Sequence, residues 1–484
     1  MSDSTLKILE YFESINAIPR CSGNEARVCE WLQQWAASRN LDSQTDAAGN
    51  LVVRIPASPG KESAPGIVLQ GHMDMVCEKT PESKHDFNKD AIVSRRDGDW
   101  LTASGGTTLG ADNGIALAYM LTLAEAPAIT HPPMELLFTV DEETGLNGAK
   151  ALKSGFITGR TLINLDSEDE GVFTIGCAGG VDTTLTFNVR KEPVPAEARL
   201  FQLTVGGLKG GHSGIDIHKH RGNANKIMAR TLTRIKKESN LGLLAITGGS
   251  RKNAIPRDAK ALIWIRADKE KQVLQAVKEM EKTLRAEFAA VDDDLFLKIQ
   301  ADAEALTGKQ ALNQQDTERV IWILFSLYNG VADMSAQLDG LVETSSNLAT
   351  VDLKGDQISI VSSQRSATTS RLEAITASVH AVAGLASAAA RDTDAYPAWQ
   401  PDMNSVLLSC AKECYHRLYG RHPVVQVIHA GLECAVIGDI YPGMEMISFG
   451  PTLRNPHSPD ESLFIPSISK VWDFLAALLK QLCE

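Results

Sequence analysis

The stretch Ile67-Val68-Leu69-Gln70-Gly71-His72-Met73-Asp74 decides how the rest of the chain is interpreted. An apolar run of strand character leads into a glycine, and His72 and Asp74 follow two positions apart. Alternate side chains of a strand point to the same side, so His72 and Asp74 are predicted to face one point at the end of a buried strand. A neutral imidazole is a common metal ligand, and its second ring nitrogen needs an acceptor. The stretch therefore indicates either a metal ligand with its orienting carboxylate or an ordinary polar loop.

The composition is that of an ordinary globular protein. The chain has 484 residues, 43% hydrophobic and 22% charged, enough for two or three domains. A net charge of -12 argues against nucleic acid or an anionic membrane as the main partner. We find no apolar run near the ~20 residues that span a bilayer and no signal-peptide pattern at the N-terminus, so we expect a cytoplasmic protein. The 8 cysteines lack CxxC spacing and are expected to be reduced thiols.

Strands alternate with helices in the first part of the chain, which predicts a largely parallel α/β sheet. Strands are expected at 51–55, 67–69, 135–140 and 161–165, and helices at 6–18 and 114–124. Ser22 and Glu25 have capping-box spacing ahead of a further amphipathic helix. Ligand sites in such sheets lie beyond the carboxyl ends of the strands.

The pattern changes near residue 190, where residues 191–197 are predicted to form a linker. Beyond it, strands (200–205, 260–265, 357–361) alternate with long helices (223–236, 269–288, 370–390). A second linker is expected at 391–402, and a strand at 446–449 belongs to the final segment. We therefore predict a discontinuous first domain, residues 1–188 and 393–484, with residues 189–392 as a second, inserted domain.

Further acids and one histidine share the chemistry of the opening stretch. They are Asp112 in GADNG, Glu142 and Glu143 in DEETG, Asp166 in NLD and His457 in NPHSPDE. Each alone has a plain alternative: a helix cap, a solvated acidic turn or an ordinary loop residue. Together, acids that converge at the mouth of one sheet would repel one another unless a cation neutralised them.

In order and spacing, the motifs GHMD, GADNG, DEETG, NLD and NPHSPDE resemble those of the M20 metallopeptidases, and most nearly the aminoacyl-histidine dipeptidase branch. The resemblance covers essentially the whole chain. It implies an α/β, di-zinc aminopeptidase-like catalytic domain with a mixed, largely parallel sheet, plus an inserted α+β lid domain. It also implies a cis peptide bond between Asp112 and Asn113.

The resemblance assigns the metal site. His72 and Asp166 would hold one zinc ion, Glu143 and His457 would hold a second, and Asp112 would bridge the two. Manganese or cobalt are expected substitutes, since carboxylate-rich sites accept them. Asp74 would orient His72, and Glu142 would act as the general base.

The resemblance also implies substrate contacts outside the metal motifs. His212 would stabilise the oxyanion, either in its own active site or in that of its partner in a dimer. Asn253 and Arg365 would bind the free C-terminal carboxylate of the substrate. A surface arginine at a strand end is the alternative for Arg365. Gly431 would allow the backbone to approach the substrate, and Glu433 would meet the free α-amino group.

These inferences predict a cytosolic, zinc-dependent dipeptidase that hydrolyses L-dipeptides with free termini, including Xaa-His dipeptides such as carnosine, and forms a homodimer. Tripeptidases, carboxypeptidases and N-acyl amino acid deacylases share the metal motifs and are the alternatives within the family. A non-catalytic metal-binding protein is the rival from another class. Glu142 argues against that rival, because metal binding alone does not require its carboxylate.

Overall fold

The computed structural model describes residues 2–302, 306–336 and 338–483. The chain divides into unit 1 (Met1–Cys177, Trp399–Val427 and Leu432–Glu484) and unit 2 (Ala178–Ala398 and Ile428–Gly431). The sequence placed the two domain boundaries after β9 (Gly179–Asn188) and inside β21 (Ala389–Tyr396). These two strands pair with each other in one sheet, and both belong to unit 2.

Unit 1 is built on an eight-stranded mixed sheet with the order β1-β2-β6-β3-β7-β23-β8-β22. Its central strands are parallel: β6 (Met134–Thr139), β3 (Ile67–His72), β7 (Thr161–Asn164) and β23 (Glu445–Ser448). The flanking strands are β1 (Asp42–Thr45), β2 (Leu51–Ile55), β8 (Val172–Cys177) and β22 (Val424–Ile428). Every residue of β3 and β6 is buried, as expected for parallel strands covered on both faces.

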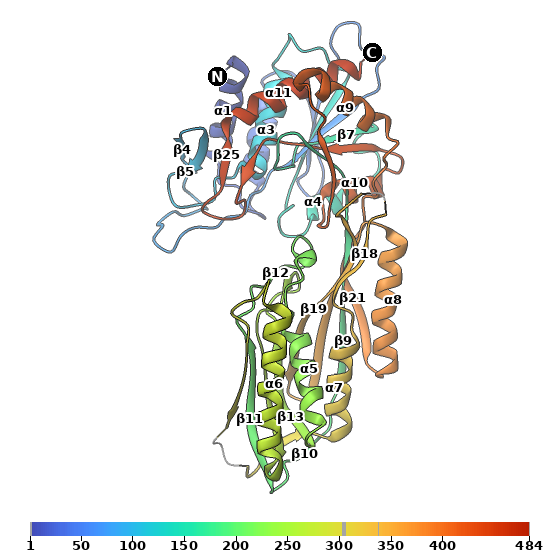
Figure 1. Cartoon of the computed structure of the whole chain (residues 1–484). Helices are drawn as coiled ribbons and strands as arrows, with labels where there is room; N and C mark the ends of the chain where they lie inside the picture. The colour runs from blue at the N-terminus through green and yellow to red at the C-terminus, as the bar shows by residue number, and fades with distance from the viewer. Residues whose placement is uncertain (1, 303–305, 337, 484) are drawn as a thin grey trace. The chain divides into compact units, whose positions relative to one another are not determined.

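Helices cover this sheet, and one of them positions the site. α3 (Ala111–Ala124) packs on β3 and on α1 (Asp3–Asn16), which also contacts α11 (Ile465–Gln481) (Figure 1). The remaining helices are α2 (Ala26–Ala37), α4 (Asn147–Ala151), α9 (Val406–Tyr419) and α10 (Glu433–Ile440). A small second sheet contains β4 (Ser94–Asp97), β5 (Trp100–Ala103), β24 (Leu453–Arg454) and β25 (Ser462–Phe464).

The capping box predicted at Ser22 and Glu25 was wrong. α2 begins after Glu25 without a side-chain cap. Ser22 Oγ instead donates to Asp74 Oδ2 at 2.7 Å, and Glu25 Oε1 accepts from the backbone N–H groups of Gly23 and Asp141. Both side chains bind residues at the strand ends, which outcompete the local cap.

Unit 2 is organised around one long antiparallel sheet, in the order β16-β11-β15-β13-β19-β20-β9-β21, with β18 beside β19. Its other strands are β11 (Ala198–Gly206), β13 (Leu241–Gly248), β15 (Ala259–Arg266), β16 (Phe296–Ala301), β18 (Gly330–Met334), β19 (Val342–Lys354) and β20 (Gln357–Ser366). Helices α5 (Ala224–Lys236), α6 (Glu270–Phe288) and α7 (Gln314–Ser326) lie side by side along these strands (Figure 1). Buried Leu203, Leu232 and Ile263 are part of the core between the helices and the sheet.

Two predictions for this unit were wrong at element ends. The helix predicted at 370–390 ends earlier, as α8 (Thr369–Leu385), and the first half of the predicted linker, residues 391–396, belongs to β21. An alanine-rich run favours helix locally, but pairing with β9 overrides that propensity. The first predicted linker holds a short strand, β10 (Lys191–Pro193), which pairs with β17 (Gln310–Leu312). None of the helices within the described ranges combines the length and apolarity needed to cross a membrane.

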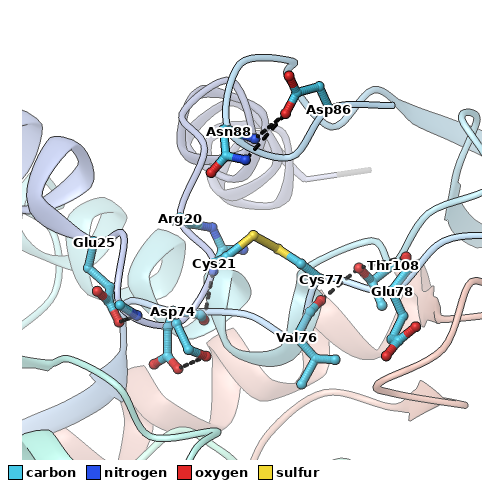
Figure 2. Close-up of a disulfide and its surroundings, with 12 residues drawn as sticks. Arg20, Cys21, Glu25, Asp74, Val76, Cys77, Glu78, Asp86, Asn88 and Thr108 are labelled. Carbon is cyan, nitrogen blue, oxygen red and sulfur yellow. Dashed lines mark hydrogen bonds between the residues drawn. A yellow bond between two sulfur atoms is a disulfide. The ribbon is translucent and has the colours of Figure 1, made fainter. Parts of the chain in front are cut away.

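The expectation that all the cysteines are reduced thiols was wrong. Cys21 and Cys77 form a disulfide bond (Figure 2), so they are not reduced thiols, whereas Cys29, Cys177, Cys410, Cys414 and Cys434 are free. The bond joins the loop ahead of α2 to the loop beyond β3, close to Arg20 and Asp74. A sequence separation of 56 with no motif spacing gave no reason to pair them.

Candidate metal centre

The predicted metal ligands gather at the carboxyl ends of the parallel strands of unit 1. β3 ends at His72, β6 leads into Glu142 and Glu143, β7 leads into Asp166, the first turn of α3 carries Asp112, and the loop between β24 and β25 carries His457. Parallel strands bring their carboxyl ends to one edge of the sheet, which is why residues far apart in sequence meet here.

Two triads of ligand atoms share Asp112. In the first, His72 Nε2 lies 3.2 Å from Asp112 Oδ1 and 3.5 Å from Asp166 Oδ1. In the second, His457 Nε2 lies 3.0 Å from Asp112 Oδ2 and 3.0 Å from Glu143 Oε2. The ligand atoms of each triad all lie within 4.8 Å of one another. Because its two oxygens face different triads, Asp112 is placed to bridge two cations.

The donor set of the triads fits a divalent transition metal. Imidazole nitrogens combined with carboxylate oxygens suit zinc, manganese and cobalt. His72 is 1% exposed, and Glu143 Oε1 is a buried acceptor without a hydrogen-bond partner among the described residues. A cation at the triads would neutralise these carboxylates and give that oxygen a partner.

Carboxylates crowd the two triads and shift the pKa values of both histidines. Burial by itself lowers the pKa of His72, but the carboxylates around it outweigh burial and raise that pKa well above its ordinary value. Hydrogen bonds to Asp112 and Glu143 raise the pKa of His457 to about 11. The carboxylates thus favour positive charge at both triads, which bound cations would supply.

Asp74 orients the imidazole of His72 through Nδ1, the ring nitrogen that does not face the triads. Asp74 Oδ1 lies 3.2 Å from His72 Nδ1, and the Asp74 side chain is fully buried. Its oxygens also accept from the backbone N–H groups of Glu142 and Glu143, at 3.1 and 3.2 Å. Desolvation raises the pKa of Asp74, but hydrogen bonds, chiefly to His72, lower it overall to about 2. Asp74 therefore stays ionised and joins the end of β3 to the acidic turn.

The expected cis peptide bond joins Asp112 to Asn113. The Asn113 side chain accepts from the N–H of His72 at 3.1 Å and donates to the carbonyl of Leu165 at 2.9 Å. Asn113 thereby ties the start of α3 to the ends of β3 and β7.

Glu142 belongs to neither of the two triads that share Asp112, but it lies next to both. One of its oxygens lies within 4.8 Å of ligand atoms of His72 and Glu143. Desolvation chiefly raises the pKa of Glu142 well above its ordinary value, and nearby carboxylates such as Asp166 add to the effect. A carboxylate with a raised pKa is a stronger base, which suits proton transfer from water near neutral pH.

Glu433 lies beneath this centre and is fully buried. Glu433 Oε2 accepts from Gln70 Nε2 at 2.5 Å and from Thr139 Oγ1 at 2.8 Å. Desolvation is the main cause that raises the pKa of Glu433 to about 7. The carboxylate thus binds residues of β3 and β6 in this structure, and its contact with a substrate α-amino group stays a prediction.

Unit 2 holds the predicted substrate-binding histidine in a defined tautomer. His212 Nδ1 accepts the backbone N–H groups of Gly214 and Ile215, at 3.3 and 3.1 Å. Desolvation and Arg365 lower the pKa of His212 to about 4, so the ring is neutral at pH 7. An accepting Nδ1 in a neutral ring leaves the proton on Nε2, which is the donor that an oxyanion requires.

Arg365 lies in β20 and is 8% exposed, so the alternative of a surface arginine was wrong. Arg365 Nη1 donates to the Tyr396 hydroxyl at 2.8 Å. The ring of Tyr396 lies close to Gly431, where an added Cβ would come within 2.9 Å of it. The side chain of Asn253, by contrast, is exposed.

Sequence reasoning missed several polar residues of this group in unit 2. Tyr396 binds Arg365, and His429 Nε2 lies 2.7 Å from Ser345 Oγ. Desolvation chiefly lowers the pKa of His429 to about 3. No spacing marks Tyr396 or Ser345, because each meets its partner only through the pairing of distant strands.

The sequence and the fold of this chain are similar to those of known peptidases. Residues 203–292 match the family model of the peptidase dimerisation domain. The cytosol non-specific dipeptidase of Escherichia coli is 39% identical over 473 residues, covering 98% of this chain and 97% of that protein. The crystal structure of aminoacylhistidine dipeptidase from Vibrio alginolyticus is 38% identical with a TM-score of 0.90, covering 99% of this chain and 98% of that one. Aminopeptidase PepT from Bacillus cereus shares the fold at 17% identity, with a TM-score of 0.58 and 99% of each chain covered.

The fold and the paired His–carboxylate triads define a metallopeptidase. The chain belongs to the M20 metallopeptidase family, and two of its similar relatives are dipeptidases. The resemblance carried by the five motifs is thereby confirmed, as is the α/β fold with an inserted α+β unit.

Proposed function

We propose that the protein is a zinc-dependent dipeptidase that hydrolyses L-dipeptides with free termini, including Xaa-His dipeptides such as carnosine. One observation carries the chemistry: two triads share Asp112, and Glu142 lies beside them outside that shared set. Similarity over the whole chain to two proteins named as dipeptidases supports the substrate class.

In this proposal each triad would hold one divalent cation. His72 and Asp166 would hold the first, Glu143 and His457 would hold the second, and Asp112 would contribute to both. When bound, such cations would lower the pKa of water and polarise the scissile carbonyl. Glu142 takes a proton from the attacking water and delivers it to the leaving amine. Asp74 holds His72 in the tautomer that presents Nε2 to the site.

The residues of unit 2 bind the substrate in this proposal. His212, of the same chain or of the partner in a homodimer, donates its Nε2–H to the developing oxyanion. Arg365 and Asn253 hold the free C-terminal carboxylate, and the bond to Tyr396 fixes the orientation of the guanidinium. Gly431 lets the backbone approach the substrate.

Hydrolysis of a small panel by chelated and then zinc-repleted protein tests the proposal. The panel contains Ala-His, β-Ala-His, a tripeptide, an N-acetyl amino acid and an N-blocked dipeptide. Zinc-restored cleavage of the first two alone supports a dipeptidase that recognises free termini. Cleavage of the tripeptide or the acetylated compound would indicate a tripeptidase, carboxypeptidase or deacylase that uses the same metal chemistry. A protein that binds two zinc ions and cleaves nothing would be a non-catalytic metal-binding protein.

Assembly and location belong to the same proposal. A homodimer is supported by the match of residues 203–292, within unit 2, to a peptidase dimerisation domain, and sedimentation at low concentration measures the oligomeric state. A cytoplasmic location is supported by the name of the Escherichia coli relative. The Cys21–Cys77 disulfide argues for an oxidising compartment, and cell fractionation distinguishes the two.

A further inference from the structure

Glu461 makes an unusual set of contacts with the loop that carries Asp112. Its side chain is 2% exposed. Glu461 Oε2 accepts the backbone N–H groups of Leu109 and Gly110 at 2.7 and 2.9 Å. Its Oε1 accepts those of Ala111 and Asp112 at 2.8 and 3.2 Å. One carboxylate therefore binds four consecutive N–H groups, the last of which belongs to the shared metal ligand itself.

Arg20 binds the same loop through a carbonyl oxygen, whereas Glu461 binds the loop through N–H groups. Its buried guanidinium donates Nη2–H to the Gly110 carbonyl at 2.5 Å and Nη1–H to the carbonyls of Met73 and Asp74, at 3.1 and 3.0 Å. Figure 2 shows Arg20 next to Cys21, with Asp74 nearby. Gly110 has a φ of 72°, and an added Cβ would lie 2.6 Å from Arg20 Nη2, so only glycine fits between the two charged groups.

Glu461 also belongs to the loop of His457, four positions further along the chain. The backbone that carries His457 and the backbone that carries Asp112 are thus joined through one carboxylate. His457 and Asp112 must meet at one cation, and Asp112 must also reach the cation of His72. A shift of the loop at 109–112 would move a ligand common to both triads.

We propose that Glu461 is a positioning residue that fixes Asp112 and His457 relative to each other, so that both cations bind. This inference rests on the proposed metal site. Residues that orient metal ligands typically contribute 10- to 100-fold to metal affinity. Because Asp112 contacts both triads, loss of Glu461 weakens both binding events, whereas loss of a ligand outside Asp112 weakens chiefly its own.

Glu461→Gln is the sharpest substitution. Glutamine keeps the shape of the side chain but replaces one oxygen by an amide group that cannot accept a hydrogen bond. That group would face two of the four backbone N–H groups, whichever way the amide is turned. Two buried donors would then lose their acceptor, and the loop would move to satisfy them.

Glu135→Gln is the matched control. Glu135 is 6% exposed and lies near the start of β6, at the opposite end of that strand from Glu142 and Glu143. Its Oε2 accepts the backbone N–H groups of Thr158 and Gly159 at 2.7 and 2.8 Å. The control therefore removes a buried carboxylate that binds backbone, but one that touches no metal-bearing loop.

The test is zinc affinity of the full-length protein, measured by competition with a chromophoric chelator, together with thermal unfolding of each metal-free variant. We expect Glu461→Gln to bind both equivalents 10- to 100-fold more weakly than the wild type. We expect Glu135→Gln to bind them like the wild type, and excess zinc to restore hydrolysis by Glu461→Gln. Equal affinity of Glu461→Gln and wild type, or equal losses in both variants, would overturn the inference. A wild type that binds no pair of zinc ions would instead overturn the proposed metal site.

Discussion

The Cys21–Cys77 disulfide gives a quantitative prediction about stability. The bond closes a loop with a sequence separation of 56, and the chain-entropy relation gives about 4 kcal/mol for such a loop. The double variant Cys21→Ser/Cys77→Ser, or reduction of the wild type, should lower the free energy of unfolding of unit 1 by that amount. Arg20 and Ser22, which bind Asp74 directly, are unchanged in the variant. Zinc affinity should therefore change far less than stability does.

The assay is urea unfolding of metal-free protein, followed by tryptophan fluorescence with and without dithiothreitol. Trp31 and Trp35 lie on α2, which begins shortly after Cys21, and report on this region. The wild type should unfold at a lower urea concentration when it is reduced, and the urea midpoint of the double variant should not depend on the reductant. Coincident wild-type curves with and without reductant would refute the stabilisation of unit 1 by the disulfide bond. Loss of zinc binding in a stably folded double variant would show instead that the bond positions Asp74.

Three further predictions concern the site. Glu142→Gln should keep two bound zinc ions and lose 10²- to 10⁴-fold in turnover of Ala-His, and near-normal turnover would refute its role as the base. His212→Ala should lower kcat by roughly 10²- to 10³-fold with zinc stoichiometry unchanged, whereas a change in zinc binding alone would contradict its role as oxyanion donor. In the metal-free protein the pKa of Glu433 is raised from 4.5 to about 7, so the folded state binds this proton more tightly than the unfolded state does. The protonated side chain therefore adds to the free energy of unfolding below pH 4.5, and that contribution is lost as pH rises through 7. Glu433→Gln should therefore flatten the fall in urea midpoint between pH 5 and about 8, and an unchanged slope would refute the assignment.

The strand-end acids and histidines could be singled out from sequence because their positions obey local rules, whereas their assignment as metal ligands rests on the resemblance to the M20 metallopeptidases. A ligand at the end of a buried strand needs an apolar run before it, as at His72 and Asp166, and a tight loop needs glycine, as at Gly110. These features remain visible in one sequence. The central parallel strands and α3 were predicted for the same reason, since burial on both faces leaves unbroken apolar runs.

The residues that hold the ligands in place could not be predicted in the same way. Glu461 binds backbone N–H groups, which almost any residue supplies, so its contacts do not show in the identity of the residues that it binds. The backbone contacts of Arg20 constrain the residue type only at Gly110. Glu461 lies 352 positions from Leu109, and Arg20 lies 90 positions from Gly110. Ser22 illustrates the opposite error: a local capping pattern was present, but Asp74 took the hydroxyl.

In the proposed mechanism, peptide hydrolysis requires two cations at the triads that share Asp112. Titration of metal-free protein with zinc, with Ala-His hydrolysis measured at each addition, tests that claim most directly. We predict no hydrolysis without metal and a rise that reaches its plateau at two equivalents per chain. Full hydrolysis by the metal-free protein, or a plateau after the first equivalent, would contradict it.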